Sequence, residues 1–336
     1  MSVVIIMDDG AALLAVEDLA VEFNVGGHFL SLGGGTRVLH AVNGVNLTVR
    51  AGECLGLVGE SGCGKSTVAL AILGLVPAAR GTITVDGMEI GADAAIDRRR
   101  LARTVQMVFQ DPYASLNPRQ TVRRTLADPL RLHGVTNKGE VEDRVAAMMR
   151  HVGLTADHAN RYPHEFSGGQ RQRIGIARAL ILHPKLVICD EPVSALDVSI
   201  RAQIINLLLE LKESLGLSYI MISHDLGVVE HMSDKVAVMY LGKIVETGDW
   251  RAIFERPGHP YTRGLIAAIP DAFAPAEISA NKVRGEIPSP FEPPSGCSFH
   301  PRCPVAVAKC RATPGPELRR IGEAHDVSCW LASTPG

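Results

Sequence analysis

Aromatic residues are scarce in this chain of 336 residues, at 4% of the total. So few rings argue against a surface on which successive nucleic-acid bases stack. A basic surplus is also missing, because 34 Lys and Arg face 36 Asp and Glu and leave a formal net charge of −2. Proteins that bind nucleic acid non-specifically usually carry such a surplus. We therefore expect no nucleic-acid partner.

Long apolar runs are absent as well. No stretch of the sequence approaches the roughly 20 apolar residues that a helix needs to span a bilayer. The first ten residues, MSVVIIMDDG, have no basic segment and reach two aspartates at once, which argues against a signal peptide. We expect a soluble, cytosolic chain whose link to any membrane comes through a partner.

Alternating strand and helix patterns predict an α/β protein with a parallel sheet and crossover connections. Strands are expected over 12–24, 37–50, 53–58, 185–189, 217–223 and 235–240, a strand and turn over 81–89, and helices over 66–75 and 200–215. A glycine-rich loop is expected over 26–35, and residues 98–110 are expected to lead from a basic turn into a strand. Residues 111–177 show helical periodicity and predict a helical insertion. Prolines become frequent beyond residue 257 and predict a separate, loop-rich extension.

Residues 59–67 read GESGCGKST, between a strand pattern and a helix pattern. This arrangement fits the phosphate-binding loop G-x-x-x-x-G-K-[ST]. Its glycines let backbone N–H groups point at phosphates, and the helix N-terminus adds a positive dipole end. Lys65 is expected to reach the β- and γ-phosphates of a nucleotide, and Ser66 to bind Mg²⁺. The predicted nucleotide-binding residues of the loop are Gly59, Glu60, Ser61, Gly62, Cys63, Gly64, Lys65, Ser66 and Thr67. A plain glycine turn is the alternative.

Two further segments carry groups that this chemistry needs. Residues 186–191, LVICDE, form an apolar strand pattern that ends in two carboxylates. Asp190 is expected to hold Mg²⁺ and Glu191 to act as the general base for water, although such a pair alone is often a solvated loop. Ser167, Gly168, Gly169 and Gln170 open a basic helix and predict a second anion-binding helix start.

The order of these motifs resembles that of the ATP-binding cassette (ABC) ATPases over most of residues 12–255. The resemblance implies a P-loop NTPase (RecA-like) core with an antiparallel β subdomain and a helical insertion at about 111–177. It assigns Gln110 to sensing Mg²⁺ and water, His224 to the γ-phosphate, and Phe23 to stacking on adenine, with strand packing as the alternative for Phe23. It also implies that Ser167–Gln170 of one subunit closes over the ATP that another subunit holds.

Several phrases are more specific, among them DPYASLNPR (111–119), HPYTRGL (259–265) and GCSFHPRCPVAVAKC (296–310). They resemble the ATPase subunits of oligopeptide, dipeptide and nickel importers. The resemblance implies hydrolysis of ATP to ADP and phosphate to power uptake of oligopeptides, dipeptides or a related solute. The implied partners are a second ATPase subunit, identical or homologous, two membrane permeases and an extracytoplasmic solute-binding protein. The chain would then be peripheral, at the cytoplasmic face of the inner membrane.

The alternative function is that of a soluble ABC ATPase of the DNA-repair or translation type. Repair members carry a long coiled coil between the two nucleotide motifs, whereas here about 100 residues separate Lys65 from Ser167 without sustained heptads. Translation members usually carry two cassettes, and this chain has one. The importer interpretation is therefore favoured.

Four of the seven cysteines, namely Cys297, Cys303, Cys310 and Cys329, lie in the extension at 256–336. Their spacing, C-x5-C-x6-C-x18-C, lacks the close pairs of a typical zinc site. Four thiolates on irregular loops suit a [4Fe–4S] cluster, and resembling family members are described with one. We predict such a cluster as a structural pin for a segment poor in apolar residues. Zinc and four reduced thiols are the alternatives.

Overall fold

Two sheets organise the computed structural model, which describes residues 12–26, 37–91, 97–269, 283 and 285–332. The smaller sheet is antiparallel and consists of β1 (Leu14–Val25), β2 (Arg37–Val49), β4 (Arg80–Val85) and β5 (Met88–Ile90), in the order β2-β1-β4-β5. The strands of the larger sheet are β3 (Cys54–Val58), β6 (Val105–Val108), β7 (Leu186–Asp190), β8 (Ser218–Ser223), β9 (Lys235–Tyr240), β10 (Lys243–Asp249), β11 (Arg319–Gly322) and β12 (His325–Val327).

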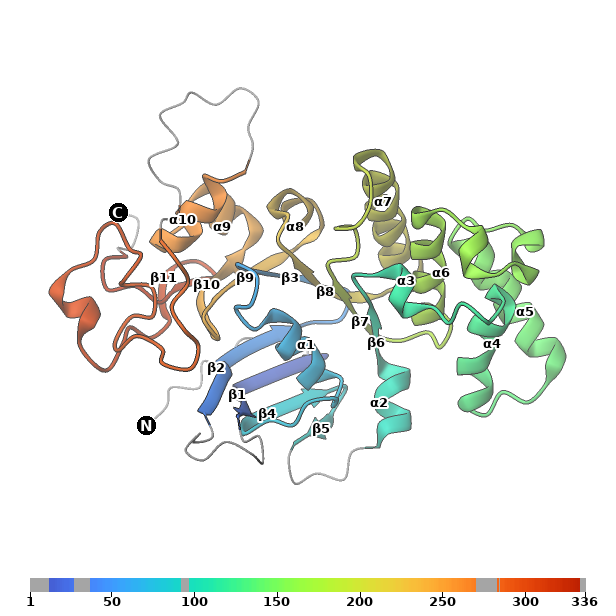
Figure 1. Ribbon diagram of the computed structural model, residues 1–336, viewed down its shortest axis with the longest axis horizontal. Helices are drawn as coiled ribbons and strands as arrows, with labels where there is room; N and C mark the ends of the chain where they lie inside the picture. The colour runs from blue at the N-terminus through green and yellow to red at the C-terminus, as the bar shows by residue number, and fades with distance from the viewer. Residues whose placement is uncertain (1–11, 27–36, 92–96, 270–282, 284, 333–336) are drawn as a thin grey trace.

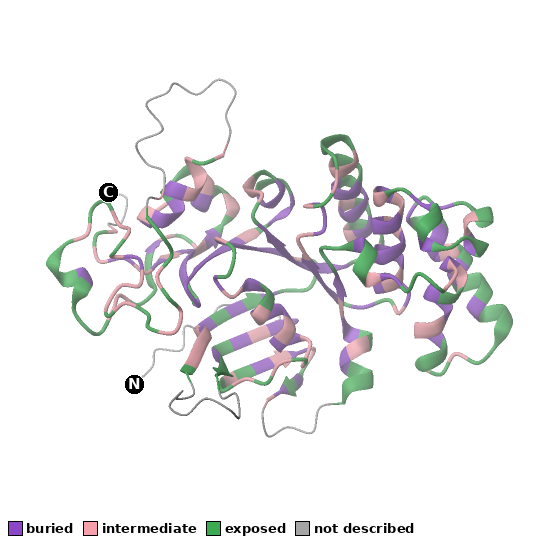
Figure 2. Cartoon of the chain, in the orientation of Figure 1, coloured by how far each residue is buried: buried purple, intermediate pink, exposed green. Residues whose placement is uncertain are grey.

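The larger sheet has the order β11-β12-β10-β9-β3-β8-β7-β6. Its strands β9, β3, β8, β7 and β6 are parallel, and β10, β12 and β11 continue it in antiparallel pairing. Every residue of β3 and β8 is buried, as Figure 2 shows. Burial on both faces explains why these strands read as continuous apolar runs. The predicted α/β class and parallel sheet are confirmed.

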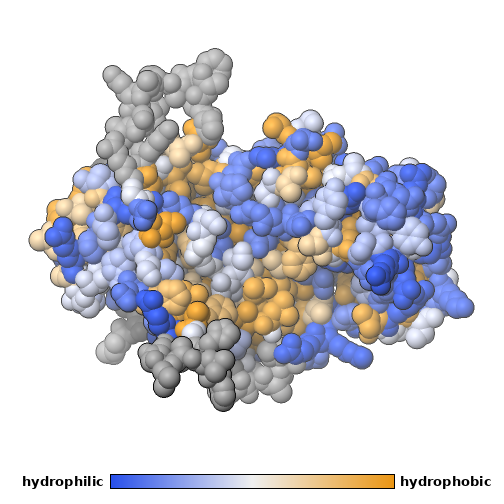
Figure 3. All heavy atoms as spheres, in the orientation of Figure 1, coloured by the Kyte–Doolittle hydropathy of each residue, from blue (hydrophilic) through white to orange (hydrophobic). Residues whose placement is uncertain are grey.

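The helices lie around the larger sheet. They are α1 (Lys65–Ile72), α2 (Arg98–Thr104), α3 (Pro112–Ser115), α4 (Val122–Leu132), α5 (Lys138–His151), α6 (Gly168–Leu180), α7 (Val198–Leu215), α8 (Leu226–Met232), α9 (Trp250–Glu255) and α10 (Pro260–Ile266). Figure 1 shows α4, α5 and α6 gathered at one end of the molecule, opposite β11. On the face drawn in Figure 3 that helical end is largely hydrophilic. A mostly helical segment within 111–177 is therefore present as expected.

One predicted turn is wrong. Residues 98–104 form α2 and not a basic turn, because the Asp97 carboxylate accepts hydrogen bonds from the backbone N–H groups of Arg99 and Arg100 at 3.1 and 3.0 Å. Such an N-cap stabilises a short helix that has little apolar periodicity of its own. The loop expected over 26–35 lies almost wholly outside the described residues.

The extension is loop-rich, as expected, but it is not separate from the larger sheet. Strand β12 pairs with β10 and β11 with β12, so the sheet continues past residue 255. The predicted division at that residue stays a prediction. No helix within the described ranges combines the length and the apolar character that a bilayer crossing needs.

Candidate nucleotide site

The phosphate-binding loop joins the end of β3 to the start of α1. Gly59 has φ 153°, and a Cβ there would lie 2.2 Å from the Met239 carbonyl oxygen. Gly64 has φ 110°, and a Cβ there would lie 2.4 Å from the Ala41 carbonyl oxygen. Both the left-handed backbone and the close approach therefore require glycine at these two positions.

Lys65 lies at the centre of this loop. Its Nζ donates hydrogen bonds to the carbonyl oxygens of Gly59 and Glu60 at 2.7 and 3.0 Å. The residue is only 6% exposed, so its charge is directed into the loop and not toward solvent. An anion bound at the loop would face an ammonium group already held in place.

A cavity of about 640 Å³ opens over the loop. Its lining residues come from the loop, from β1 and β2, from the ends of β6, β7 and β8, and from the extension: Phe23, Leu39, His40, Ala41, Ser61, Gly62, Gly64, Lys65, Ser66, Thr67, Gln110, Asp190, Glu191, His224, Leu241, Gly242 and Pro290. A nucleotide-sized ligand would therefore meet groups from these segments and from the turn between β9 and β10, which supplies Leu241 and Gly242.

Three of the predicted catalytic side chains meet at one end of this cavity. The Glu191 carboxylate accepts a hydrogen bond from Gln110 Nε2 at 2.8 Å and lies 3.1 Å from His224 Nδ1. Gln110, Glu191 and His224 follow β6, β7 and β8 within one or two residues. The carboxyl ends of parallel strands meet at one edge of a sheet, and that edge is where such folds bind ligands.

The backbone at Glu191 holds its carboxylate in position. Glu191 has φ 48°, an uncommon value for a residue with a side chain. Its N–H donates to the Ile222 carbonyl oxygen at 2.9 Å, which fixes the turn after β7. Backbone conformations of this kind gather at active sites.

Asp190 occupies the end of β7, beside Lys65 and Ser66. Burial raises the pKa of the Asp190 carboxyl, while the hydrogen bond from Ser66 works in the opposite direction. Carboxylate, hydroxyl and amide oxygens are the ligands that Mg²⁺ prefers. The donor set that the sequence predicts for Mg²⁺, from Ser66, Asp190 and Gln110, therefore fits this ion.

Residues Ser167–Gln170, which we call the signature segment, lie away from this cavity. None of its four described residues, Ser167 to Gln170, is among the residues that line the cavity. Ser167 is the N-cap of α6, where its Oγ accepts from the Gln170 N–H at 3.3 Å and its own N–H donates to Gln170 Oε1 at 3.1 Å. Gly169 packs against α7, because a Cβ there would lie 2.4 Å from Ile200.

Sequence reasoning missed the contribution of the extension to this site. Pro290 lines the cavity although it is 225 positions beyond Lys65 (290 − 65). Nearby, Arg37 of β2 pairs with Glu292 at 3.0 Å and its guanidinium lies over the Phe291 ring. Phe23, predicted to stack on adenine, lies on the cavity wall and is 36% exposed. No motif links residues so distant in sequence, so only the fold could reveal Pro290.

The predicted iron–sulfur cluster is not supported. Among the described residues, which include all four tail cysteines, no group of three or more His, Cys, Asp or Glu side chains is placed to hold a metal ion. The extension does have apolar contacts with the sheet. Phe299 is buried against Tyr240 and Tyr261, and Cys329 packs with Val327 of β12 in an apolar cluster. Burial and strand pairing hold the extension to the sheet.

Comparisons with known proteins agree with this geometry. The ABC transporter family model matches residues 42–194, and the model for the C-terminal region of oligopeptide/dipeptide transporters matches residues 245–310. The oligopeptide transport ATP-binding protein OppF of Salmonella typhimurium is 50% identical over 96% of this chain and 97% of its own. The di/tripeptide transport ATP-binding protein DppF of Pseudomonas aeruginosa is 47% identical over 88% of this chain and 90% of its own.

Solved structures show the same cassette fold. A dimeric ATP-binding cassette in a post-hydrolysis state, bound to ADP and Pi, superposes with a TM-score of 0.60 at 26% identity, over 71% of this chain and 99% of its own. The cbiO1 protein of Clostridium perfringens, part of an ABC transporter complex, gives a TM-score of 0.62 at 28% identity, over 73% of this chain and 91% of its own. The predicted P-loop NTPase core is thus confirmed. The chain belongs to the ABC transporter family, in the branch of ATP-binding proteins that carry the oligopeptide/dipeptide transporter C-terminal region.

Proposed function

We propose that this chain is the ATP-hydrolysing subunit of an ABC importer for oligopeptides or dipeptides. The observation that carries the ATPase part is the contact of Gln110 and His224 with Glu191 beside the phosphate loop. The importer part rests on the relatives. They are peptide transport ATP-binding proteins, and this chain matches them over nearly their whole length. A soluble repair or translation ATPase is not favoured, because residues 245–310 of this chain match the C-terminal region of oligopeptide/dipeptide transporters.

In the nucleotide-bound state, the loop from Gly59 to Thr67 surrounds the phosphates and Lys65 binds the β- and γ-phosphates. Ser66 and Asp190, with Gln110 nearby, would hold Mg²⁺, which would neutralise charge on the phosphate oxygens. Phe23 offers its ring to the adenine. These assignments follow the cavity lining and the chemistry of each side chain.

Glu191 is the general base in this proposal. Its carboxylate takes a proton from the attacking water, and the contacts from Gln110 and His224 hold it in one orientation. His224 is 61% exposed at its side chain, so it is free to reach a γ-phosphate at the cavity mouth. The roles depend on geometry because phosphoryl transfer is catalysed mainly by positioning and charge.

The site needs a second ATPase subunit, identical or homologous. The signature residues Ser167–Gln170 open a helix N-terminus that does not line the cavity of their own chain. A second subunit could place the same helix start against the γ-phosphate, where the dipole and the N–H groups would stabilise negative charge. Two ATP molecules would then lie between the two subunits.

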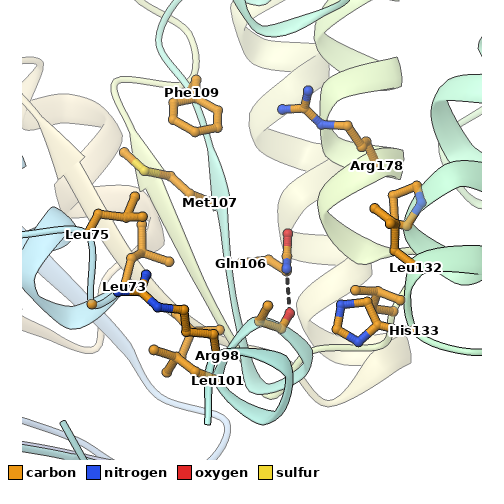
Figure 4. A pocket seen from close by; sticks show the side chains of 15 residues that line it. Leu73, Leu75, Arg98, Leu101, Gln106, Met107, Phe109, Leu132, His133 and Arg178 are labelled. Atoms are coloured by element: carbon orange, nitrogen blue, oxygen red, sulfur yellow. Dashed lines mark hydrogen bonds between the residues drawn. The ribbon is translucent and has the colours of Figure 1, made fainter. Parts of the chain in front are cut away.

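The permease partner is expected at an apolar groove of about 540 Å³ between the core and the helical insertion. Figure 4 shows Leu73 and Leu75 on one side of it and Leu132 and Arg178 on the other. Leu75 and Leu132 are 59% and 71% exposed, which is unusual for two leucines that face one hollow. Two permeases and an extracytoplasmic solute-binding protein complete the proposed importer, which would place this chain at the cytoplasmic face of the inner membrane.

The test of the ATPase assignment is Glu191→Gln, which retains the shape of the side chain but cannot accept the proton. We expect ATP binding to persist and turnover to fall by about 10²–10⁴-fold, the usual contribution of a general base. The measurements are nucleotide affinity and phosphate release by the purified variant. Near-normal phosphate release would contradict the assignment of Glu191.

A further inference from the structure

One carboxylate stands in the loop that should bind a polyanion. Glu60 is the second residue of the phosphate-binding loop, and its side chain is 25% exposed. Glu60 is not among the residues that line the cavity, but its negative charge belongs to the loop and opposes binding of the expected triphosphate by Coulomb repulsion. The phosphate chemistry does not need this carboxylate. A positive charge from another part of the chain must therefore neutralise it.

That compensation comes from the C-terminal extension. Arg302 Nη1 and Nη2 donate to the two carboxylate oxygens of Glu60 at 2.6 and 2.9 Å, across 242 positions of sequence. Such a two-pronged contact between a guanidinium and a carboxylate is among the strongest and most directional in proteins. Tyr261, also in the extension, accepts a hydrogen bond from the Glu60 N–H at 2.8 Å.

The Arg302 side chain is buried and held by several contacts. It is only 5% exposed, its Nη1 lies 3.5 Å from the Tyr240 hydroxyl, and its guanidinium lies over the Tyr240 ring. Tyr240, Tyr261 and Phe299 form a buried aromatic group next to it. The hydrogen bonds with Glu60 raise the pKa of Arg302, so its charge is permanent at any working pH.

We infer that Arg302 is a positioning residue for ATP, which neutralises the Glu60 carboxylate and thereby makes the phosphate-binding loop able to accept the triphosphate. The inference rests on the proposed function, because it concerns the affinity of the same site. It gives the C-terminal extension a part in nucleotide binding. The alternative is that the Arg302–Glu60 pair only fastens the extension to the cassette.

The two alternatives differ in the effect of neutralising Glu60. We expect Arg302→Gln to weaken binding of Mg-ATP about tenfold, the size of one lost charge-assisted contact, because the carboxylate is then uncompensated. Glu60→Gln keeps the backbone through which residue 60 forms the loop and removes only the opposing charge, so it should bind Mg-ATP more tightly than the natural protein. The double variant Arg302→Gln with Glu60→Gln should regain natural affinity, which a fastening role would not predict.

The measurement is the affinity of each purified full-length variant for Mg-ATP by calorimetry, with thermal unfolding recorded beside it. Arg320→Gln is the matched control, since Arg320 pairs with a carboxylate of the extension itself, Asp326, at 2.7 Å and not with one of the phosphate-binding loop. Arg302→Lys keeps the charge and should stay within about threefold of natural affinity, since one hydrogen bond of the fork is lost.

Equal weakening in Arg302→Gln and in the double variant would overturn the inference, as would unchanged affinity in Arg302→Gln. If Arg302→Gln does not fold, the double variant decides: natural affinity supports the inference, and tenfold weaker binding overturns it. Failure of the natural protein and of Arg320→Gln to bind Mg-ATP would overturn the proposed function itself, and is thus distinct from a failure confined to Arg302.

Discussion

At the scale of single residues, His259 shows how burial sets a charge state. It caps α10, where its Nδ1 accepts a hydrogen bond from the Tyr261 N–H at 3.1 Å, so the ring is neutral and its proton is on Nε2. The residue is 1% exposed. Burial lowers the pKa of His259 from 6.5 to about 4, although the nearby Glu246 favours the charged form.

This lowered pKa predicts a specific loss of stability in acid. Between pH 6.5 and 4 the unfolded chain binds a proton at His259 and the folded chain does not, so the free energy of unfolding falls as the pH falls through that window. The contribution reaches at most about 3–4 kcal/mol, at 1.4 kcal/mol per pKa unit. His259→Asn keeps a cap acceptor without the titration and should show a shallower loss in urea unfolding at pH 7.5 and 5. The exposed His151→Asn serves as control, and identical pH slopes for His259→Asn and the natural protein would refute the assignment.

Some residues of the nucleotide site could be predicted from the sequence, and others could not. Gln110, Glu191 and His224 could be predicted because each follows a strand pattern and the motifs occur in a fixed order. Arg302 and Pro290 could not, because they reach the site through the path of an extension whose contacts no local pattern encodes. The iron–sulfur cluster gained no support from the described residues, since spacing alone says nothing of whether four thiols share one centre.

At the scale of elements, strands that are buried on both faces were the most predictable. β3, β7 and β8 are short apolar runs that pack in parallel, and only one class of structure fits them. Helix α2 and the hairpin β11–β12 were not predicted, because α2 buries only Leu101 and Thr104 and β11 begins with two exposed arginines. The Asp97 cap stabilises α2, and pairing with β10 stabilises the hairpin. Neither contact can be read from the apolar pattern of the element itself.

The groove beside α2 carries a prediction at this scale. Leu75→Lys combined with Leu132→Lys places two charges on the apolar walls. Both leucines are more than half exposed, so each change should alter the free energy of unfolding by no more than about 0.5 kcal/mol. ATP hydrolysis by the ATPase subunits in the absence of permeases should persist, whereas co-purification with the permeases should be lost.

The control for the groove is Val305→Lys, an equally exposed apolar side chain on the extension at 51%. It should leave co-purification intact. Retention of the permeases by the groove variant would show that docking occurs at another surface.

At the scale of the whole molecule, the two anion-binding helix starts of one chain do not share one cavity, because Ser167–Gln170 lie outside the residues that surround the phosphate loop. We propose that a complete site takes two chains, and Ser167→Arg tests this. The arginine places bulk and charge where the γ-phosphate of a second subunit should lie. We expect nucleotide binding by the monomer to persist and ATP-driven dimerisation, with its cognate ATPase partner, to fail. Light scattering in the Glu191→Gln background, in which hydrolysis cannot separate the subunits, measures the dimer.

Ser167→Ala is the matched control, because it removes the same cap acceptor, at a cost of about 1 kcal/mol, without adding bulk or charge. It should still dimerise. If the monomer instead loses its nucleotide affinity in Ser167→Arg alone, Ser167 acts on the ATP of its own chain and the two-subunit site is wrong.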